Sequence, residues 1–324
     1  MLDLFDESIW LPDNVTWAQM KSTDKITYPN FYDLLYTIPG GVALLVVRIL
    51  LESFVFIPLG WASGWIQTPL FSRIWEHLSG GFAGRSKFKR VAECCWRFSF
   101  YLSAWIAGLI ILWDSPQFKD VTECWKNWPY HHVSNAVWWY YMTEASFYWA
   151  LLIGTIYLDV RRADFYQMLL HHAITIALLY ISWTMNMVRV GTLILFSHDA
   201  ADIVLDLMKV VRYAKWHNAV SGLYVFFMFV WIATRLFYYP FWVIQSIWFD
   251  APALIQDSYR WENFFQRPIV PRVLMIMLTS LLFLHIFWTY VLLKIAYMST
   301  KSGSIDDVRE DDDSDEDERH KKTE

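Results

Sequence analysis

Seven long apolar segments constrain the fold of this chain more than any other feature of its sequence. They cover residues 38–61, 98–113, 135–158, 165–183, 189–211, 220–248 and 273–298. A helix needs about 20 mostly apolar residues to cross a bilayer, and in lipid its backbone must satisfy its own hydrogen bonds. The sequence therefore predicts an all-α, polytopic integral membrane helix bundle with about seven transmembrane helices. Pro240 predicts a kink in the sixth segment.

The composition agrees with this fold class, and the charge is unevenly distributed. Hydrophobic residues make up 56% of the chain and aromatic residues 19%, which is more than a soluble domain needs and suits aromatic belts at both membrane surfaces. Residues 306–324 contain 11 acidic and 4 basic side chains. Such a block is usually solvated, so we expect a disordered acidic C-terminal tail over residues 301–324. Within it, Ser314 is a candidate phosphorylation site.

The distribution of basic residues predicts how the chain is oriented in the membrane. Connections rich in Arg and Lys alternate with connections that hold few or none, the rich ones being 62–97, 159–164 and 209–217. This pattern predicts a lumenal N-terminus and a cytosolic C-terminus, and the N-glycosylation sequon at Asn14 agrees with it. Lys321 and Lys322 resemble a retrieval signal, so we expect a multi-pass protein of the endoplasmic reticulum membrane.

Ionisable residues interrupt the fifth apolar segment. At about 100° per residue, one helix face carries His198, Asp199, Asp202 and Asp206. Charged groups are costly in hydrocarbon and usually face a bundle interior or a cavity. Three carboxylates cannot all stay charged and unpaired in a dry core, so some must be protonated or paired with cations or imidazoles. Residues 171–172 supply a histidine pair in the preceding segment.

Three interpretations of these groups remain open from the residues alone. The first is acyl transfer by acid–base or nucleophilic chemistry, for which histidine is suited because its pKa lies near neutral and a carboxylate can fix its tautomer. The second is a metal site as in membrane hydroxylases and desaturases, which would need many histidines in HxxxH and HxxHH spacings. The chain has 9 histidines and no such box, so we expect no metal. The third is a structural network of buried polar groups.

Several separated motifs resemble those of one family. The run from His171 through residues 189–193 to His198, Asp199 and Asp202 resembles the Lag1 motif of ceramide synthases, which lies in a TRAM-Lag-CLN8 (TLC) domain. Further similarity occurs at residues 10–17, 96–101, 235–242 and 284–288. The resemblance covers roughly residues 9–300. The 62–97 connection is too short for the homeobox-like domain of many animal members, which bears on regulation more than on chemistry.

The resemblance implies N-acylation of a sphingoid base by a fatty acyl-CoA, which gives dihydroceramide or ceramide and CoA. It implies the catalytic residues His171, His172, Asp199 and Asp202, with the aspartates orienting the imidazoles. We expect the substrate pocket to include Arg189, His198 and Asp206. Basic candidates for facing the CoA phosphates are Arg161, Arg162, Lys209 and Arg212.

The expected partners and domains follow from the same resemblance. Acyl-CoA is a substrate, so no cofactor is expected. The expected partners are a sphingoid base and membrane lipid, with no nucleic acid; a homo- or heterodimer is left open. The expected division of the chain is a lumenal segment (1–36), a first helix with its cytosolic connection (37–93), a TLC catalytic domain (94–300) and the tail (301–324). The alternative function is that of a non-enzymatic TLC-domain protein, either lipid-sensing or accessory to the translocon.

Overall fold

The computed structural model describes residues 6–83, 87–159, 162–214, 216–256 and 258–302. It confirms the predicted all-α membrane bundle, and no β-strand occurs within these ranges. The long helices are α2 (Thr37–Leu51), α5 (Lys87–Leu112), α7 (Asn135–Tyr157), α8 (Phe165–Thr184), α9 (Val188–Tyr213), α10 (His217–Trp231) and α12 (Val270–Ser302). The shorter segments are α1 (Glu7–Trp10), η1 (Trp17–Met20), η2 (Phe31–Tyr36), η3 (Glu52–Phe56), α3 (Ile57–Ala62), α4 (Leu70–Leu78), η4 (Gly81–Ala83), α6 (Pro116–Lys119), η5 (Val121–Cys124), η6 (Ile232–Ile244) and α11 (Gln245–Ile255). The candidate residues Arg161 and Ser314 lie outside the described residues.

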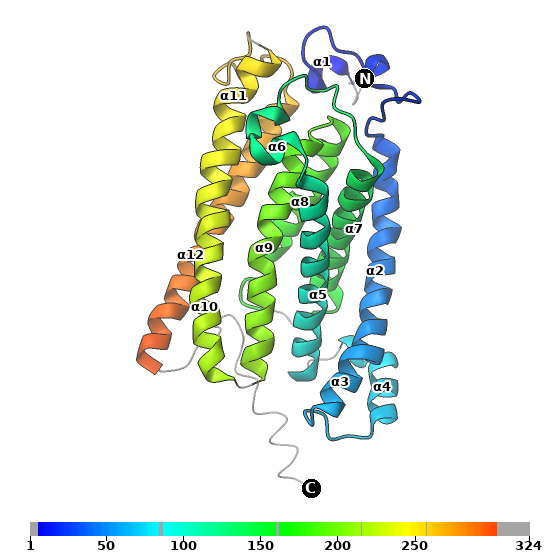
Figure 1. The fold of residues 1–324 in the computed structure, drawn as a ribbon, viewed down its shortest axis with the longest axis vertical. Coiled ribbons are helices and arrows are strands. Elements are labelled where there is room, and N and C mark those ends of the chain that lie inside the picture. Colours follow the sequence, from blue (N-terminus) through cyan, green and yellow to red (C-terminus); the bar gives the residue numbers. More distant parts are fainter. Residues whose placement is uncertain (1–5, 84–86, 160–161, 215, 257, 303–324) are drawn as a thin grey trace.

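The long helices run side by side along the long axis of the molecule (Figure 1). One end, called here the N-terminal end, carries α1, α6 and the far end of α11; the opposite end carries α3, α4 and the C-terminal end of α12 (Figure 1). Backbone hydrogen bonds tie the N-terminal segment to this first end. Ile269 donates to the carbonyl of Ile9 at 2.9 Å, and Val133 donates to that of Thr27 at 2.9 Å.

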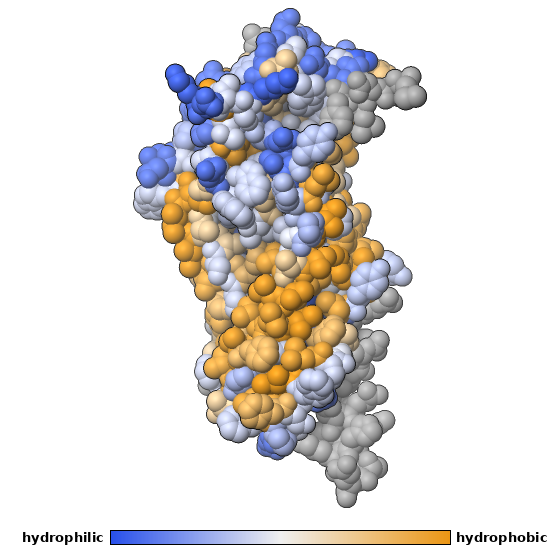
Figure 2. Space-filling view, turned by 90° about the vertical axis from the view of Figure 1, so that its right-hand side faces the viewer, coloured by the Kyte–Doolittle hydropathy of each residue, from blue (hydrophilic) through white to orange (hydrophobic). Residues whose placement is uncertain are grey.

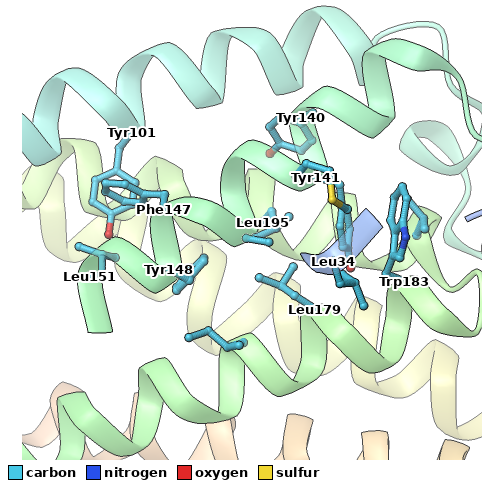
Figure 3. Packing of buried hydrophobic residues seen from close by; sticks show 14 of the residues in the cluster. Leu34, Tyr101, Tyr140, Tyr141, Phe147, Tyr148, Leu151, Leu179, Trp183 and Leu195 are labelled. Carbon is cyan, nitrogen blue, oxygen red and sulfur yellow. The ribbon is translucent and has the colours of Figure 1, made fainter. Parts of the chain in front are cut away.

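Helix α9 lies at the centre of the bundle and packs against α5, α10 and η6, while α7 packs against α2 and α8. Aromatic rings fill much of the space between α5, α7 and α8. Phe100 and Phe147 stack with ring centroids 3.5 Å apart. Tyr101 meets Phe147 edge-on at 5.3 Å, and Figure 3 shows these two residues side by side. These aromatic contacts fix the rotation of α5 relative to α7.

Five helices are long and apolar enough to cross a membrane, within the described residues: 31–62, 88–112, 165–184, 219–255 and 270–300. They supply an apolar band around the middle of the molecule, with hydrophilic residues at the N-terminal end (Figure 2). The helices α7 and α9 match two further predicted segments but are not among the five. Helix α9 carries three aspartates, and α7 is rich in Trp and Tyr, whose polar atoms lower its hydropathy. The count of about seven spans therefore stays a prediction.

The helix through Pro240 changes its winding rather than simply bending. Residues 232–244 form a π-helix between α10 and α11, and the three segments continue one another. Proline lacks an N–H group and clashes with the carbonyl one turn earlier, so the wider winding relieves the contact that an α-helix would force. The wide turn places the buried Arg235 against α9.

Candidate active site

The histidine pair lies on α8 within the bundle. The His171 ring meets Trp288 of α12 edge-on at 5.4 Å, and its ring centroid is 6.5 Å from that of Tyr148 on α7. No described residue forms a hydrogen bond with its buried Nδ1 atom. The adjacent His172 is buried, and its Nδ1 lies 3.5 Å from the hydroxyl of Thr155. The two imidazoles thus face different surroundings, as neighbours on a helix must.

Two cavities meet at this point, because His171 and Tyr148 line both of them. The first cavity contains about 1060 Å³ of space and is almost wholly apolar. It extends toward the N-terminal end, where it is lined by Trp125, Ile255 and Trp261. From His171 to the end of α8 at Thr184 is about 13 residues, or about 20 Å of helix, so the cavity has the depth of a long hydrocarbon chain.

The second cavity contains about 1250 Å³ and has a polar wall. It lies toward the opposite end of the bundle and is lined by Arg97, Asp159, Arg162, Asp206 and Lys209, among others. Arg97 forms an ion pair with Asp206 at 3.2 Å. Asp159 is held at 2.9 Å by Arg48 of α2. This cavity can therefore accommodate a polar, charged group while the first accommodates an apolar one.

The aspartates of the motif have partners other than the histidine pair. Asp202 lines the second cavity and forms an ion pair with Arg235 of η6 at 2.8 Å. Asp199 is completely buried, lines neither cavity and lies against Glu144 of α7. No hydrogen bond joins either carboxyl group to His171 or His172 in the described part of the chain. The role of these aspartates in orienting the imidazoles therefore stays a prediction.

Arg235 connects several buried groups that the sequence did not link. It donates to the backbone carbonyl of His198 at 2.9 Å, and its Nη1 lies 3.3 Å from Nε2 of His285. His198 lines the first cavity, where its ring contacts those of Tyr239 and His285 at 5.1 Å. An arginine within an apolar segment is itself a sign of function, so the sequence alone could have pointed to Arg235 as a site residue.

Other predicted residues fall in different places. Asp206, Arg162 and Lys209 line the second cavity, as a substrate-facing role requires. Arg189 lines neither cavity. Its guanidinium donates to the carbonyl of Glu123 at 2.7 Å, and it thereby holds η5 against α9 near the N-terminal end. Arg212 also lines neither cavity and lies over the ring of Tyr213, 5.1 Å from its centroid. Among the described residues, no group of three His, Cys, Asp or Glu side chains is placed to hold a metal ion.

Comparison with known proteins agrees with this arrangement. Residues 90–294 match the family model described as the TLC domain, so the chain is a TLC-domain membrane protein. Two ceramide synthases of Caenorhabditis elegans, hyl-2 and hyl-1, are 47% and 45% identical over 94% of this chain, and the alignments cover 92% and 83% of those proteins. Human ceramide synthase 3 is 32% identical over 94% of this chain and 86% of its own length. The chain belongs to the ceramide synthase family.

Proposed function

We propose that this protein transfers the acyl group of a fatty acyl-CoA to the amine of a sphingoid base and releases CoA. The observation that carries the proposal is the place of His171, where a deep apolar cavity meets a polar cavity lined by both basic and acidic side chains. A thioester bound across this junction would put its hydrocarbon in the first cavity and its phosphates toward the second. Its reactive carbonyl would then lie beside an imidazole.

The reaction needs a neutral amine, whereas a sphingoid amine, like that of lysine, is mostly protonated at pH 7. In one route His171 accepts a proton from the amine, which attacks the thioester carbon; the C–S bond breaks and the thiolate takes up a proton. In the other, the His171 nitrogen attacks the thioester carbon first, the C–S bond breaks and the CoA thiolate leaves and takes up a proton; the acyl-histidine then passes its acyl group to the unprotonated amine, which frees the imidazole again. Both routes require an unprotonated imidazole nitrogen with space before it.

The direct test is a panel of acyl-CoA chain lengths incubated with sphinganine and purified protein, with products measured by mass spectrometry. We expect N-acyl sphinganine, with a preference for chains that fill the first cavity. A folded protein that gives no product with any chain length would contradict the proposal and favour the non-enzymatic lipid-sensing or translocon-accessory function.

Chain-length preference should respond to the N-terminal end of the first cavity. Ile255 lies half-buried at the end of α11 and lines this cavity. Replacing it with tryptophan fills space that a long acyl chain would occupy. Each methylene group that can no longer be buried there weakens binding by about 0.8 kcal/mol. We expect I255W to lower turnover of the longest accepted acyl-CoA about tenfold while shorter ones react as before. An unchanged product distribution would show that the chain does not extend to this point.

The basic side chain of Arg162 in the wall of the second cavity should affect acyl-CoA binding. Arg162 lines that cavity, whereas Arg212 lies outside it and serves as a matched control. We expect R162E to raise KM for acyl-CoA about three- to tenfold at low salt, with a smaller effect at high salt because the attraction is screened. R212E should change KM by less than about twofold. Equal effects of the two variants would indicate general surface charge rather than a phosphate site.

We also propose a multi-pass location in the endoplasmic reticulum membrane with a lumenal N-terminus. Asn14 is exposed in a left-handed turn near the N-terminal end, so its side chain is accessible to modification. We expect expression in microsomes to add one glycan that is removed by endoglycosidase and abolished in N14Q. A single unmodified species with both sequences would place the N-terminal end on the cytosolic side.

A further inference from the structure

Two carboxyl groups face each other in the interior of the bundle. Glu144 of α7 is 1% exposed and Asp199 of α9 is fully buried. All four carboxyl oxygens are enclosed, and no N–H or hydroxyl group of the described residues donates to any of them. The two carboxyl groups instead lie within hydrogen-bonding reach of each other. An ionised carboxylate only accepts hydrogen bonds, so this contact requires a proton on one of the two groups.

The charged surroundings favour a pair that holds a single proton. Arg235 is in electrostatic contact with Asp199, but its guanidinium is engaged by Asp202 at 2.8 Å. The other titratable groups facing the pair are Tyr101 of α5 and Tyr140 and Tyr148 of α7. Two carboxylates in contact cannot both ionise in a dry site, whereas a shared proton stabilises one negative charge across both groups. A lone buried Asp199 without a donor would stay neutral.

The pair connects to the histidines through Tyr148. Tyr148 follows Glu144 by one helical turn on α7, interacts electrostatically with both carboxyl groups and lines both cavities. Its ring centroid lies 6.5 Å from those of both His171 and His172. The groups that also face His171 are His198 of α9, Arg235 of η6 and His285 of α12. Tyr148 thus lies between the carboxyl pair and the histidines.

We propose that Glu144 and Asp199 share one proton and that the pair accepts the further proton that each acyl transfer releases. This inference rests on the proposed function: an ammonium and a thioester give an amide, a thiol and one surplus proton. The proton passes from the imidazole to the pair, whose charge changes from −1 to zero, and then leaves to water in the second cavity. Glu144 is a positioning residue, because it acts through Asp199 by keeping that carboxyl group able to ionise.

Glutamine and leucine at position 144 separate this role from simple packing. Both have about the volume of glutamate, but only the amide of glutamine can donate to an Asp199 carboxylate. We expect E144L to lower kcat about tenfold at pH 7 with KM for acyl-CoA within about twofold, and to regain activity as the pH rises. E144Q should fall between E144L and the unaltered protein. Equal loss in both variants at every pH, together with lowered thermal stability, would reduce Glu144 to a packing role.

Infrared spectroscopy tests the shared proton without relying on turnover. The unaltered protein should show the carbonyl band of a hydrogen-bonded carboxylic acid that shifts in D2O, and the E144Q/D199N double variant should lack it. Glu52 is a matched control, because its carboxylate is held by Arg48 at 2.9 Å and His77 at 3.0 Å, so E52Q should keep the band. A band that remains in the double variant would overturn the proposal that Glu144 and Asp199 share a proton. A band present in a protein without transferase activity would overturn the proposed function and leave the pair standing.

Discussion

Replacing His171 with alanine should lower N-acyl transfer by at least about a hundredfold, since a general base or nucleophile contributes about 10²- to 10⁴-fold. The expected size follows from position: His171 lines both cavities, and its Nδ1 is unpaired among the described residues. The measurement is product formation per minute from acyl-CoA and sphinganine by purified protein. Thermal unfolding should change little, because the lost ring leaves space beside an existing cavity.

His132 provides a matched control for this substitution. It is exposed in the connection before α7, where its Nδ1 accepts a hydrogen bond from the backbone of Thr27 at 3.0 Å, and it lines neither cavity. H132A should retain activity within about twofold. Turnover by H171A comparable with that of H132A would remove His171 from the mechanism and leave His172 or His198 as the base.

Replacing Arg235 with methionine should destabilise the protein by about 3 kcal/mol, the low end of the cost of leaving a buried charge without its partner. Asp202 would lose its 2.8 Å ion pair, while the carbonyl of His198 would lose its donor. The Asp202 side chain keeps 23% of its surface exposed, toward the second cavity, which limits the penalty. Thermal or denaturant unfolding of the detergent-solubilised protein measures the loss.

A double-mutant cycle shows whether the ion pair is the cause. D202N removes the charge that R235M would leave unpaired, so the R235M/D202N protein should be more stable than R235M alone. If the two substitutions are instead additive, the stability of this region comes from packing of Arg235 against Trp231 rather than from the charge pair. In either case R235M should also lower activity, because Asp202 lines the cavity next to the histidines.

The helical bundle could be predicted because it depends on local patterns. Apolar segments of sufficient length dictate helices in a membrane, and the structure has helices over all of the predicted segments. The winding around Pro240 could not be predicted in detail. Proline excludes a regular α-helix at that point, but whether the chain bends or widens into a π-helix depends on how the neighbouring helices pack.

The site was only partly predictable for a related reason. The spacing of Asp199, Asp202 and Asp206 puts them near one another on α9, but spacing on one helix does not show which other helix supplies each partner. Glu144 and Arg235 are single charges in apolar segments, which the sequence shows, but their partners appear only when α7 and η6 pack beside α9. Arg189 belongs to the same motif as the aspartates but lies at the other end of its helix.

The sequence by itself determined that this chain forms a helical membrane bundle of the ceramide synthase family and that its histidines and aspartates lie within the bundle. Helix periodicity and hydropathy are local properties, so they can be read along the chain. The tertiary structure was needed to show that His171 lies between two cavities, that Asp202 pairs with Arg235 and that Asp199 lies against Glu144. Those relations join side chains from different helices, and the packing of large aromatic residues between the helices sets which of them meet.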